Sequence, residues 1–568
     1  MRTVFILLSF LATAGARAQL YLAETYPKGY FRNPLDIPIS LSGNFGELRP
    51  NHYHMGLDLK TNKVENLSIR AAAEGYIARI KIEPGGFGRA IYINHPNGYT
   101  TLYAHLNNFF PALEQYVKEQ QYQKESWNVY LELPPNLFPV KKGDFIARSG
   151  NTGGSQAPHL HFEVRRTADD VNINPMLLGF PLADNTRPVI VRLGIYDRTK
   201  STYEQTPRLL PAKKQGNNFI ISASPILVSS PKISFSIAAY DTHSGSTNRN
   251  GIFEAVLFDN EKLAGGFRMN NISYESTRGL NAHIDYKLRS VGGAYMQHLS
   301  RLPGYRNSIY RTLPEDGVLD VSDGNEHAIR IDVADGYGNK SVLSFRVKYN
   351  GAIPLAQDLP GKMFYPMMVD GFETPDCEFF IGENTLYDSA SINYARMNST
   401  DPAAISMVHR IGTTSIPIAD ALVVRIKPSR ELTAEEAKRT IMKRISGTRT
   451  EVQKVEWNNG MAKASFREFG NFQLMLDVEE PAIIPIGFKN GSDLSKASRI
   501  VITVKDNFNR FKNFRGELDG KWLRFTNDKG RTFIYYFDEK CPAGDHKLKV
   551  RVEDEAGNVA VANFDFRR

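Results

Sequence analysis

The sequence is poor in cysteine and in long apolar runs. Its 568 residues include only two cysteines, Cys377 and Cys541, which lie far apart. A scaffold held by disulfides, a cysteine-ligated metal site and thiol catalysis therefore have no support, and pairing of these two cysteines is left open. Beyond residue 18, no stretch approaches the roughly 18 consecutive apolar residues of a membrane-spanning helix. We therefore expect no transmembrane segment.

A strong charge of either sign is also missing. Lysine and arginine number 70 against 61 acidic residues, and the net charge is +9. No basic run has interleaved aromatic residues, so nucleic acid is a poor candidate partner. A mildly basic chain instead suits anionic surfaces such as cell-wall polymers.

The first 18 residues have the pattern of a secretory signal peptide. Arg2 precedes an apolar run from Val4 to Ala14, and Ala16-Arg17-Ala18 is typical of a cleavage site. No cysteine follows the run, so a lipoprotein anchor is not indicated. We expect an exported protein, periplasmic or extracellular, whose mature chain starts at Gln19.

Length and aromatic content predict a mainly β chain of several domains. A chain of 568 residues exceeds what one hydrophobic core serves, and its 33 Phe and 26 Tyr favour strands.

Histidine is concentrated in one region, where six of the chain's twelve histidines lie between His52 and His161. Side chains alternate along a strand, so His159 and His161 should share a face. If the segment around Gly56 is extended, His54 and Asp58 also share a face. Two imidazoles and a carboxylate suit Zn²⁺ and leave a fourth position for water.

These histidines stand in a segment, about 41–165, that resembles the lysostaphin-type or LytM-type zinc endopeptidases. The likeness rests on the histidine stretches 52–58, 103–106 and 158–163, with support from 43–49, 73–77, 86–95, 140–144 and 149–155. It implies a β-sandwich with a duplicated hybrid motif.

Carried over to this sequence, the resemblance makes His54, Asp58 and His161 the zinc ligands. It makes His105 and His159 the pair that orients the attacking water and stabilises the oxyanion. Which of the two takes the proton stays open. His52 is an alternative to His54, but its offset from Asp58 does not fit the family spacing, so we place it at the rim.

The peptidase domain is predicted over 19–185, with an insertion at about 109–138. Asn97-Gly98 predicts a hairpin, which places His105 at a strand end. In the insertion, Pro111 suits a helix start and 127–133 reads as a strand. The insertion either walls or caps the substrate groove, or it is a surface excursion that packs on the sandwich.

Three further β-rich units are expected after a linker at 181–188. They are an immunoglobulin-like sandwich over 188–350, a middle domain over 360–478 with a short capped helix at 432–440, and a C-terminal immunoglobulin-like sandwich over 482–568. Segments 327–339 and 546–558 repeat a strand followed by Asp-x-x-Gly-Asn. For Asp335 and Asp554 we favour turn capping over Ca²⁺ binding, and we interpret His327 and His546 as structural.

The function expected from these features is an exported zinc endopeptidase that hydrolyses peptidoglycan cross-links or stem peptides. One alternative is a non-hydrolytic peptidoglycan-binding protein that positions or activates another cell-wall hydrolase. Another is a zinc protease acting on a secreted protein. For the peptidoglycan endopeptidase, the C-terminal sandwiches would serve as spacers, wall-binding modules or docking sites for protein partners. For the protease of a secreted protein, they would be recognition modules for that target.

Overall fold

The chain is built mainly of β-strands, which confirms the predicted class. The computed structural model describes residues 20–21, 24–182, 184–244, 246–351, 359–527 and 530–568, so the predicted signal peptide lies outside it. No helix in this part of the chain combines the length and the apolar character needed to cross a bilayer.

The N-terminal region contains a large sheet with the order β1-β4-β13-β8-β7-β6-β10 and a small one with the order β5-β12-β9. Their buried side chains form one core cluster. The strands of the large sheet are β1 (Leu41–Gly43), β4 (Leu57–Lys60), β13 (His159–Arg166), β8 (Tyr99–Ala104), β7 (Arg89–Asn94), β6 (Gly75–Ile82) and β10 (Val129–Glu132). Those of the small sheet are β5 (Ser68–Arg70), β12 (Phe145–Ser149) and β9 (Leu106–Phe109).

The hairpin, the helix and the strand predicted in this region are confirmed. β7 and β8 pair across Asn97-Gly98, and Gly98 has the positive φ of 82° that such a turn requires. The helix α1 (Pro111–Gln123) has proline at its start and buries Leu113 and Val117. β10 adds to the sheet beside β6, at the end opposite β4. The inserted residues therefore extend the sheet on the side away from His54 and Asp58.

The second region has two sheets that share one core. The first, β16-β15-β20-β23, is formed by β16 (Arg208–Pro211), β15 (Val189–Asp197), β20 (Lys232–Tyr240) and β23 (Gln297–His298). The second, β17-β18-β26-β25-β21-β22, is formed by β17 (Lys213–Gln215), β18 (Asn218–Ile220), β26 (Lys340–Tyr349), β25 (Glu326–Ala334), β21 (Glu254–Asp259) and β22 (Lys262–Arg268).

The third and fourth regions also consist of paired sheets. The main strands of the third are β28 (Asp370–Glu373), β29 (Cys377–Ile381), β33 (Leu422–Ile426), β34 (Thr440–Ser446), β37 (Met461–Phe466) and β38 (Gly470–Leu476). Those of the fourth are β39 (Ala482–Ile486), β41 (Arg499–Lys505), β42 (Phe511–Leu518), β44 (Thr532–Tyr536), β45 (Asp545–Asp554) and β46 (Val559–Arg567). The helix α4 (Ala434–Lys438) starts with a capping box formed by Thr433 and Glu436, which agrees with the capped helix expected at 432–440. Cys377 and Cys541 are both buried and free.

The repeated Asp-x-x-Gly-Asn segments form equivalent turns in the second and fourth regions. Asp335 accepts hydrogen bonds from the backbone N–H groups of Tyr337 and Asn339. Asp554 accepts hydrogen bonds from the backbone N–H groups of Gly557 and Asn558. Turn capping, the favoured interpretation of both aspartates, is confirmed.

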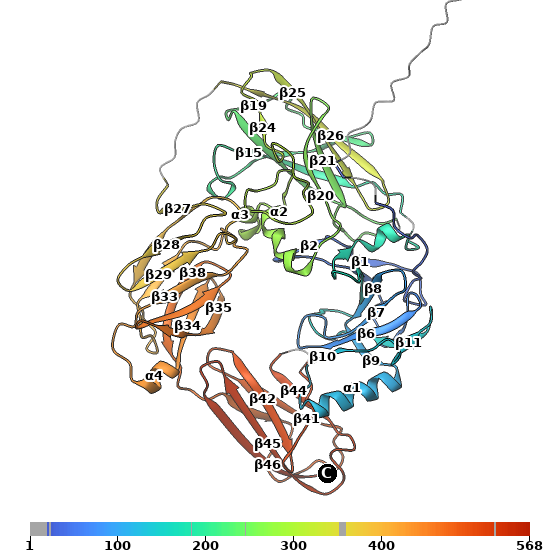
Figure 1. Cartoon of the computed structure of the whole chain (residues 1–568), viewed down its shortest axis with the longest axis vertical. Coiled ribbons are helices and arrows are strands. Elements are labelled where there is room, and N and C mark those ends of the chain that lie inside the picture. The colour runs from blue at the N-terminus through green and yellow to red at the C-terminus, as the bar shows by residue number, and fades with distance from the viewer. Residues whose placement is uncertain (1–19, 22–23, 183, 245, 352–358, 528–529) are drawn as a thin grey trace, which may run out of the picture.

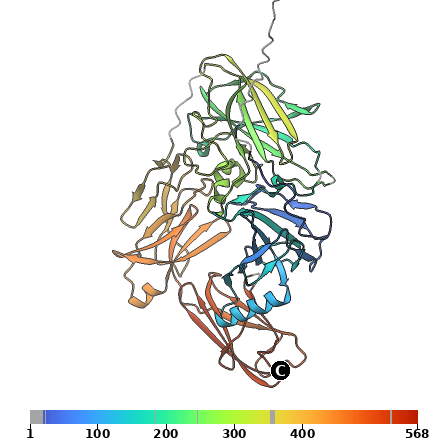
Figure 2. The same cartoon turned by 45° about the vertical axis from the view of Figure 1, so that its right-hand side comes forward.

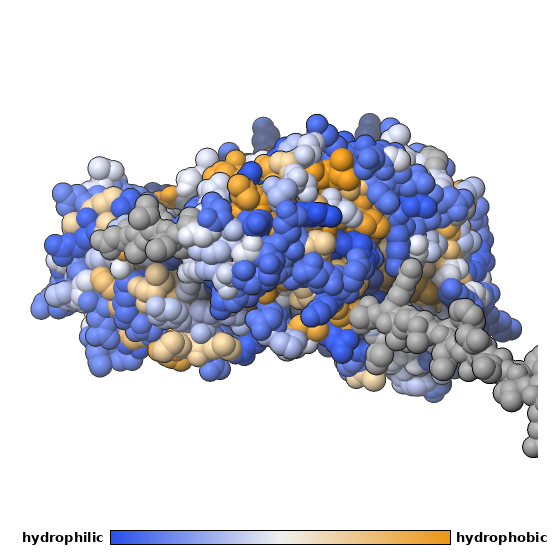
Figure 3. Space-filling model, turned by 90° about the horizontal axis from the view of Figure 1, so that it is seen from above, coloured by the Kyte–Doolittle hydropathy of each residue, from blue (hydrophilic) through white to orange (hydrophobic). Residues whose placement is uncertain are grey.

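The regions follow one another around a closed path, and the last meets the first at α1 (Figures 1 and 2). Lys118 of α1 pairs with Asp538 and Glu539 at 2.9 and 2.8 Å, and the Tyr122 ring packs edge-on against Trp522. The insertion therefore contacts the C-terminal region. Seen from above, the surface is mostly hydrophilic with smaller apolar areas (Figure 3).

Candidate metal site

Two neighbouring strands of the large sheet carry Asp58 and His161. β4 and β13 are antiparallel, and Asp58 lies opposite His161 in their register. Directly opposed residues project from the same face of a sheet. His54 comes from the segment just before β4, and its Nε2 lies 3.0 Å from Asp58 Oδ1 and 3.0 Å from His161 Nδ1. The structure thus brings together the three residues predicted as ligands.

The donor atoms of these three residues fit a zinc ion. All three residues are buried, and the distance from His161 Nδ1 to Asp58 Oδ1 is also 3.0 Å. Donors bound tetrahedrally at about 2.0–2.2 Å lie roughly 3.3–3.6 Å from one another, close to these separations. Two imidazole nitrogens and one carboxylate oxygen are also a donor set that zinc prefers.

Hydrogen bonds at the far side of each ring fix which nitrogen faces the centre. His54 Nδ1 lies 2.7 Å from the carbonyl oxygen of Asn44, so Nδ1–H donates and Nε2 is left as the ligand atom. His161 Nε2 lies 2.8 Å from Glu163 Oε1, so Nε2–H donates and Nδ1 is left. Such outer contacts orient metal-binding histidines.

Charges around the centre favour a cation between the ligands. Burial alone would raise the pKa of Asp58, but His54, His159 and His161 hold it well below its ordinary value. Burial likewise opposes protonation of His161, yet Asp58 and Glu163 raise its pKa to about 9. The space beside His161 is therefore strongly negative, which attracts either a proton or a metal ion.

His105 and His159, the predicted catalytic pair, stand beside the ligands with ring centroids 4.8 Å apart. His105 directly follows β8 in a left-handed conformation, with φ of 60°, and its Nδ1 lies 2.9 Å from the carbonyl oxygen of Thr152. His159 Nδ1 lies 2.8 Å from the carbonyl oxygen of Ala157, and its Nε2 is 3.3 Å from Asp58 Oδ1. Burial and the nearby His161 and His159 lower the pKa of His105 to about 3, which keeps this ring neutral.

Three residues at this site had no predicted role. Arg49 binds the outer oxygen of Asp58 at 2.5 Å, which leaves Oδ1 for the centre. Glu163, fully buried, accepts from His161 and pairs with Arg165 at 2.7 Å. Tyr274, from the second region, donates its hydroxyl to Glu163. Glu163 was detectable from its spacing of two residues along a strand, whereas the contact with Tyr274 carries no sequence signal.

The second region also holds His54 in place. Tyr53 and Met55 flank His54, and both are buried in the core cluster that the second and third regions share. Because an extended chain alternates its faces, His54 then points the opposite way, toward Asp58. Tyr53 also lies 3.3 Å, hydroxyl to hydroxyl, from Tyr305 of that region. The ligand segment is thus anchored outside the sheet that supplies Asp58 and His161.

A glycine permits the close approach of this segment to β13. A Cβ atom on Gly56 would lie 2.4 Å from the carbonyl oxygen of Phe162, so any side chain would push the two segments apart. Gly153 and Gly88 pack against each other in the same way, each with positive φ. These glycines therefore serve backbone geometry.

A cavity of about 970 Å³ opens onto the site. Asp58, His105 and His159 line it, together with basic side chains at its rim: Arg49, His52, Lys60 and Lys63. No lining residue comes from the insertion at 109–138, so the expectation that it walls the groove is not supported. His52 is exposed at the rim, as we predicted.

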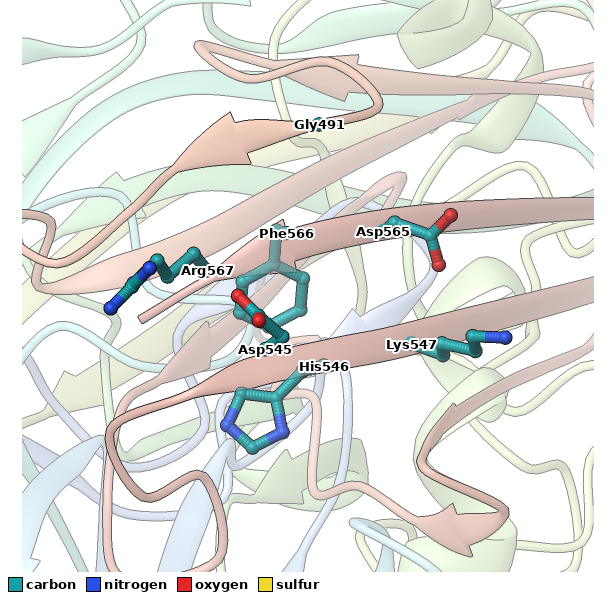
Figure 4. A pocket seen from close by; sticks show the side chains of 7 residues that line it. All are labelled: Gly491, Asp545, His546, Lys547, Asp565, Phe566 and Arg567. Carbon is teal, nitrogen blue, oxygen red and sulfur yellow. The ribbon is translucent and has the colours of Figure 1, made fainter.

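A smaller pocket of about 320 Å³ lies in the C-terminal region between the ends of β45 and β46 (Figure 4). Its histidine, His546, has both ring nitrogens 2.7 Å from acceptors, Asp519 Oδ2 and the carbonyl oxygen of Pro542. These contacts agree with the structural role predicted for His546.

Comparison with known families agrees with this geometry. The model of peptidase family M23 matches residues 52–122 and 138–175, which include all five predicted site residues. The N-terminal region is a peptidase family M23 domain. The gap in the match falls inside the predicted insertion. A Zu5-like domain model matches residues 362–477.

Among curated relatives, the chain is similar to an uncharacterized metalloprotease of Haemophilus influenzae, with 30% identity over 30% of this chain and 32% of that protein. It is also similar to the DD-carboxypeptidase/endopeptidase Mpg of Neisseria meningitidis, with 32% identity over 30% of each chain. The match thus spans about a third of the length of these relatives. It supports a metallopeptidase role for the M23 domain.

Solved structures also match part of the chain. They include the catalytic domain of the prophage-encoded M23 protein EnpA from Enterococcus faecalis, at 18% identity and a TM-score of 0.20 over 26% of this chain and 96% of that one. The catalytic domain of lysostaphin from Staphylococcus simulans matches at 25% identity and a TM-score of 0.15, over 22% of this chain and 76% of that one.

Proposed function

We propose that this chain is an exported zinc endopeptidase that cleaves peptide bonds in peptidoglycan cross-links or stem peptides, in the periplasm or outside the cell. The observation that carries the proposal is the group formed by His54, Asp58 and His161, which lies beside a cavity lined by Asp58, His105 and His159. The relative named DD-carboxypeptidase/endopeptidase supports the substrate class.

His54, Asp58 and His161 would hold the zinc ion through Nε2, Oδ1 and Nδ1. A bound zinc ion polarises a carbonyl group and lowers the pKa of a bound water toward about 7. His159 Nε2 and His105 Nε2 both face the centre, because each Nδ1 is occupied by a backbone carbonyl oxygen. In this proposal Nε2 of one of the two rings orients the attacking water and accepts its proton, and the Nε2–H formed in this way then donates to the developing oxyanion.

The rim of the cavity supports an anionic peptide substrate. Arg49, His52, Lys60 and Lys63 lie along the cavity. Stem peptides of peptidoglycan carry free carboxylates, which basic side chains attract. Lys63 is exposed, and Lys60 is held by the side chain of Asn248 at 3.1 Å. We therefore expect these two lysines to act in binding and not in the chemical step.

Mass spectrometry of muropeptides tests the proposal. Purified sacculi are incubated with the zinc-loaded chain that starts at Gln19, with Asp58→Ala as the blank. Conversion of cross-linked dimers to monomers by the native chain only is the expected result, and the product masses identify the bond. Identical profiles from the two proteins, with both bound to sacculi, would reject catalysis in favour of a binding role. Cleavage of a secreted protein, with sacculi left intact, would reject the substrate class.

A further inference from the structure

A second group of metal-binding side chains lies where the M23 domain leads into the second region. Asp184 belongs to the linker, Asp241 directly follows β20, and His243 is two residues further on. One possible donor atom from each lies within 4.8 Å of the others. All three side chains are buried, Asp241 with only 1% exposure.

Asp241 is the unusual member of this group. Both of its carboxylate oxygens are buried, and neither has a hydrogen-bond partner among the residues that the structure describes. A buried carboxylate without a partner is strongly unfavourable. Over the described ranges, no lysine or arginine forms an ion pair with it, and its near neighbours are two further carboxylates, Asp184 and Asp335.

The neighbouring groups are oriented toward a shared ligand. Asp184 Oδ1 accepts hydrogen bonds from the N–H and hydroxyl of Thr186 and from the N–H of Ser244. Its other oxygen, Oδ2, lies 3.2 Å from His243 Nδ1. His243 Nε2 is buried without a partner in the described part of the chain. Asn250 pairs with Asp241 through reciprocal backbone bonds of 2.9 and 2.8 Å, and its side-chain oxygen is also unsatisfied there.

We propose that Asp184, Asp241 and His243 bind a divalent transition-metal cation, such as Zn²⁺ or Mn²⁺, at the junction between the M23 domain and the second region. A cation would satisfy the oxygens of Asp241 and offset the mutual repulsion of the aspartates. An imidazole beside carboxylates suits these ions better than Ca²⁺ or Mg²⁺, which prefer oxygen donors alone. Since the donors are buried, the site is structural and joins the linker to the end of β20.

The fourth region repeats part of this arrangement at its own entry. Asp477, Asp506 and Asp554 lie within the same limit of 4.8 Å. Asn558 donates to the carbonyl oxygen of Asp477 at 3.0 Å, as Asn339 does to that of Asp184 at 3.2 Å. Phe508 occupies the position of His243, so only the first copy combines carboxylates with an imidazole.

Zinc content tests the proposal separately from the M23 site. The test uses the full chain from Gln19 with Asp58→Ala, which removes a predicted ligand of the M23 site. The protein is stripped with a chelator, reloaded with Zn²⁺ and desalted. We expect it to retain stoichiometric zinc and to lose it when Asp241→Asn is added. Asp285→Asn is the matched control, because Asp285 is equally buried in the same region but accepts from Tyr196 and Leu288.

Thermal unfolding provides a second measurement that does not depend on the Asp58 variant. In chelator, Asp241→Asn should melt no lower than the native chain, since it removes a buried unpaired carboxylate. With Zn²⁺ or Mn²⁺ the native chain should gain several degrees more than Asp241→Asn does, whereas Asp285→Asn should show the full gain. Zinc content and metal-dependent stability unchanged by Asp241→Asn would overturn the proposal. Stabilisation by Ca²⁺ alone would overturn the choice of metal.

Discussion

The chain contains two buried groups of histidine and aspartate that differ in what surrounds them. At the M23 site, each histidine has one ring nitrogen bound to a protein acceptor, and Arg49 neutralises the outer oxygen of Asp58. At the junction site, the carboxylate oxygens of Asp241 have neither a hydrogen bond nor an ion pair with a lysine or arginine among the described residues. Outer contacts and an open cavity favour a reactive site, whereas a closed set of donors favours a structural one.

The comparison shows why ligand type alone does not define a catalytic centre. Both groups offer carboxylate and imidazole donors within 4.8 Å of one another. Only the first group lies beside a cavity of about 970 Å³, and two further histidines, His105 and His159, line that cavity. Access and orientation, and not donor chemistry, separate the two.

The largest difference we predict is in the rate of sacculus digestion when one ligand is removed from each group. Asp58→Ala or His161→Ala should abolish zinc binding at the M23 site and lower the rate of sacculus digestion by about 10³-fold or more, since metal activation contributes several kcal/mol. Asp241→Asn should leave that rate within about twofold, because this side chain touches no part of the cavity. Rates are measured by release of muropeptides. Full zinc content and activity in Asp58→Ala would show that the ligand assignment is wrong.

His159→Ala should separate catalysis from metal binding within the M23 site. His159 faces the centre through Nε2 but is not among the three predicted ligands. We expect elemental analysis to show unchanged zinc, while turnover falls by about 10²–10⁴-fold, the usual contribution of a proton-transfer group. His52→Ala at the rim is the control and should retain most of the turnover. An undiminished rate in His159→Ala would mean that this ring only packs.

Removing the hydrogen bond between Tyr274 of the second region and Glu163 should lower metal affinity or activity less than removing His159 lowers turnover. Tyr274→Phe keeps the ring over Arg165 but removes the hydroxyl that donates to Glu163. Loss of an outer contact of this kind typically costs about 10- to 100-fold in metal affinity or activity. A chelator competition assay measures the affinity, and Tyr365→Phe, at an exposed tyrosine, is the control. Equal affinities would show that Glu163 is held adequately by its ion pair with Arg165 and by the side-chain amide of Asn172, which donates to it at 2.8 Å.

Local patterns in the sequence predicted the short-range parts of this site. The alternation in 158–163 placed His159 and His161 on one face, and Asn97-Gly98 placed His105 at the end of β8. Residues that act across regions could not be predicted in this way. Tyr274 reaches Glu163 over 111 residues, and the burial of Tyr53 and Met55 depends on a core formed by a different region. Asp184 and Asp241 were not recognised because isolated aspartates in a linker and after a strand have no distinctive spacing.

The insertion illustrates the same limit and leads to the smallest predicted effect. Its helix and strand were predicted correctly, but its partner is the C-terminal region and not the groove. Lys118→Ala removes ion pairs with Asp538 and Glu539 in which Lys118 is partly exposed, so we expect a loss below about 1 kcal/mol in unfolding free energy. Lys124→Ala, near the end of the same helix, is the control for a change of charge alone. Turnover should stay unchanged in both variants, because α1 does not line the cavity. A large rise in the turnover of Lys118→Ala would instead show that docking of the C-terminal region on α1 restrains the M23 site, which would restore the capping role considered for the insertion.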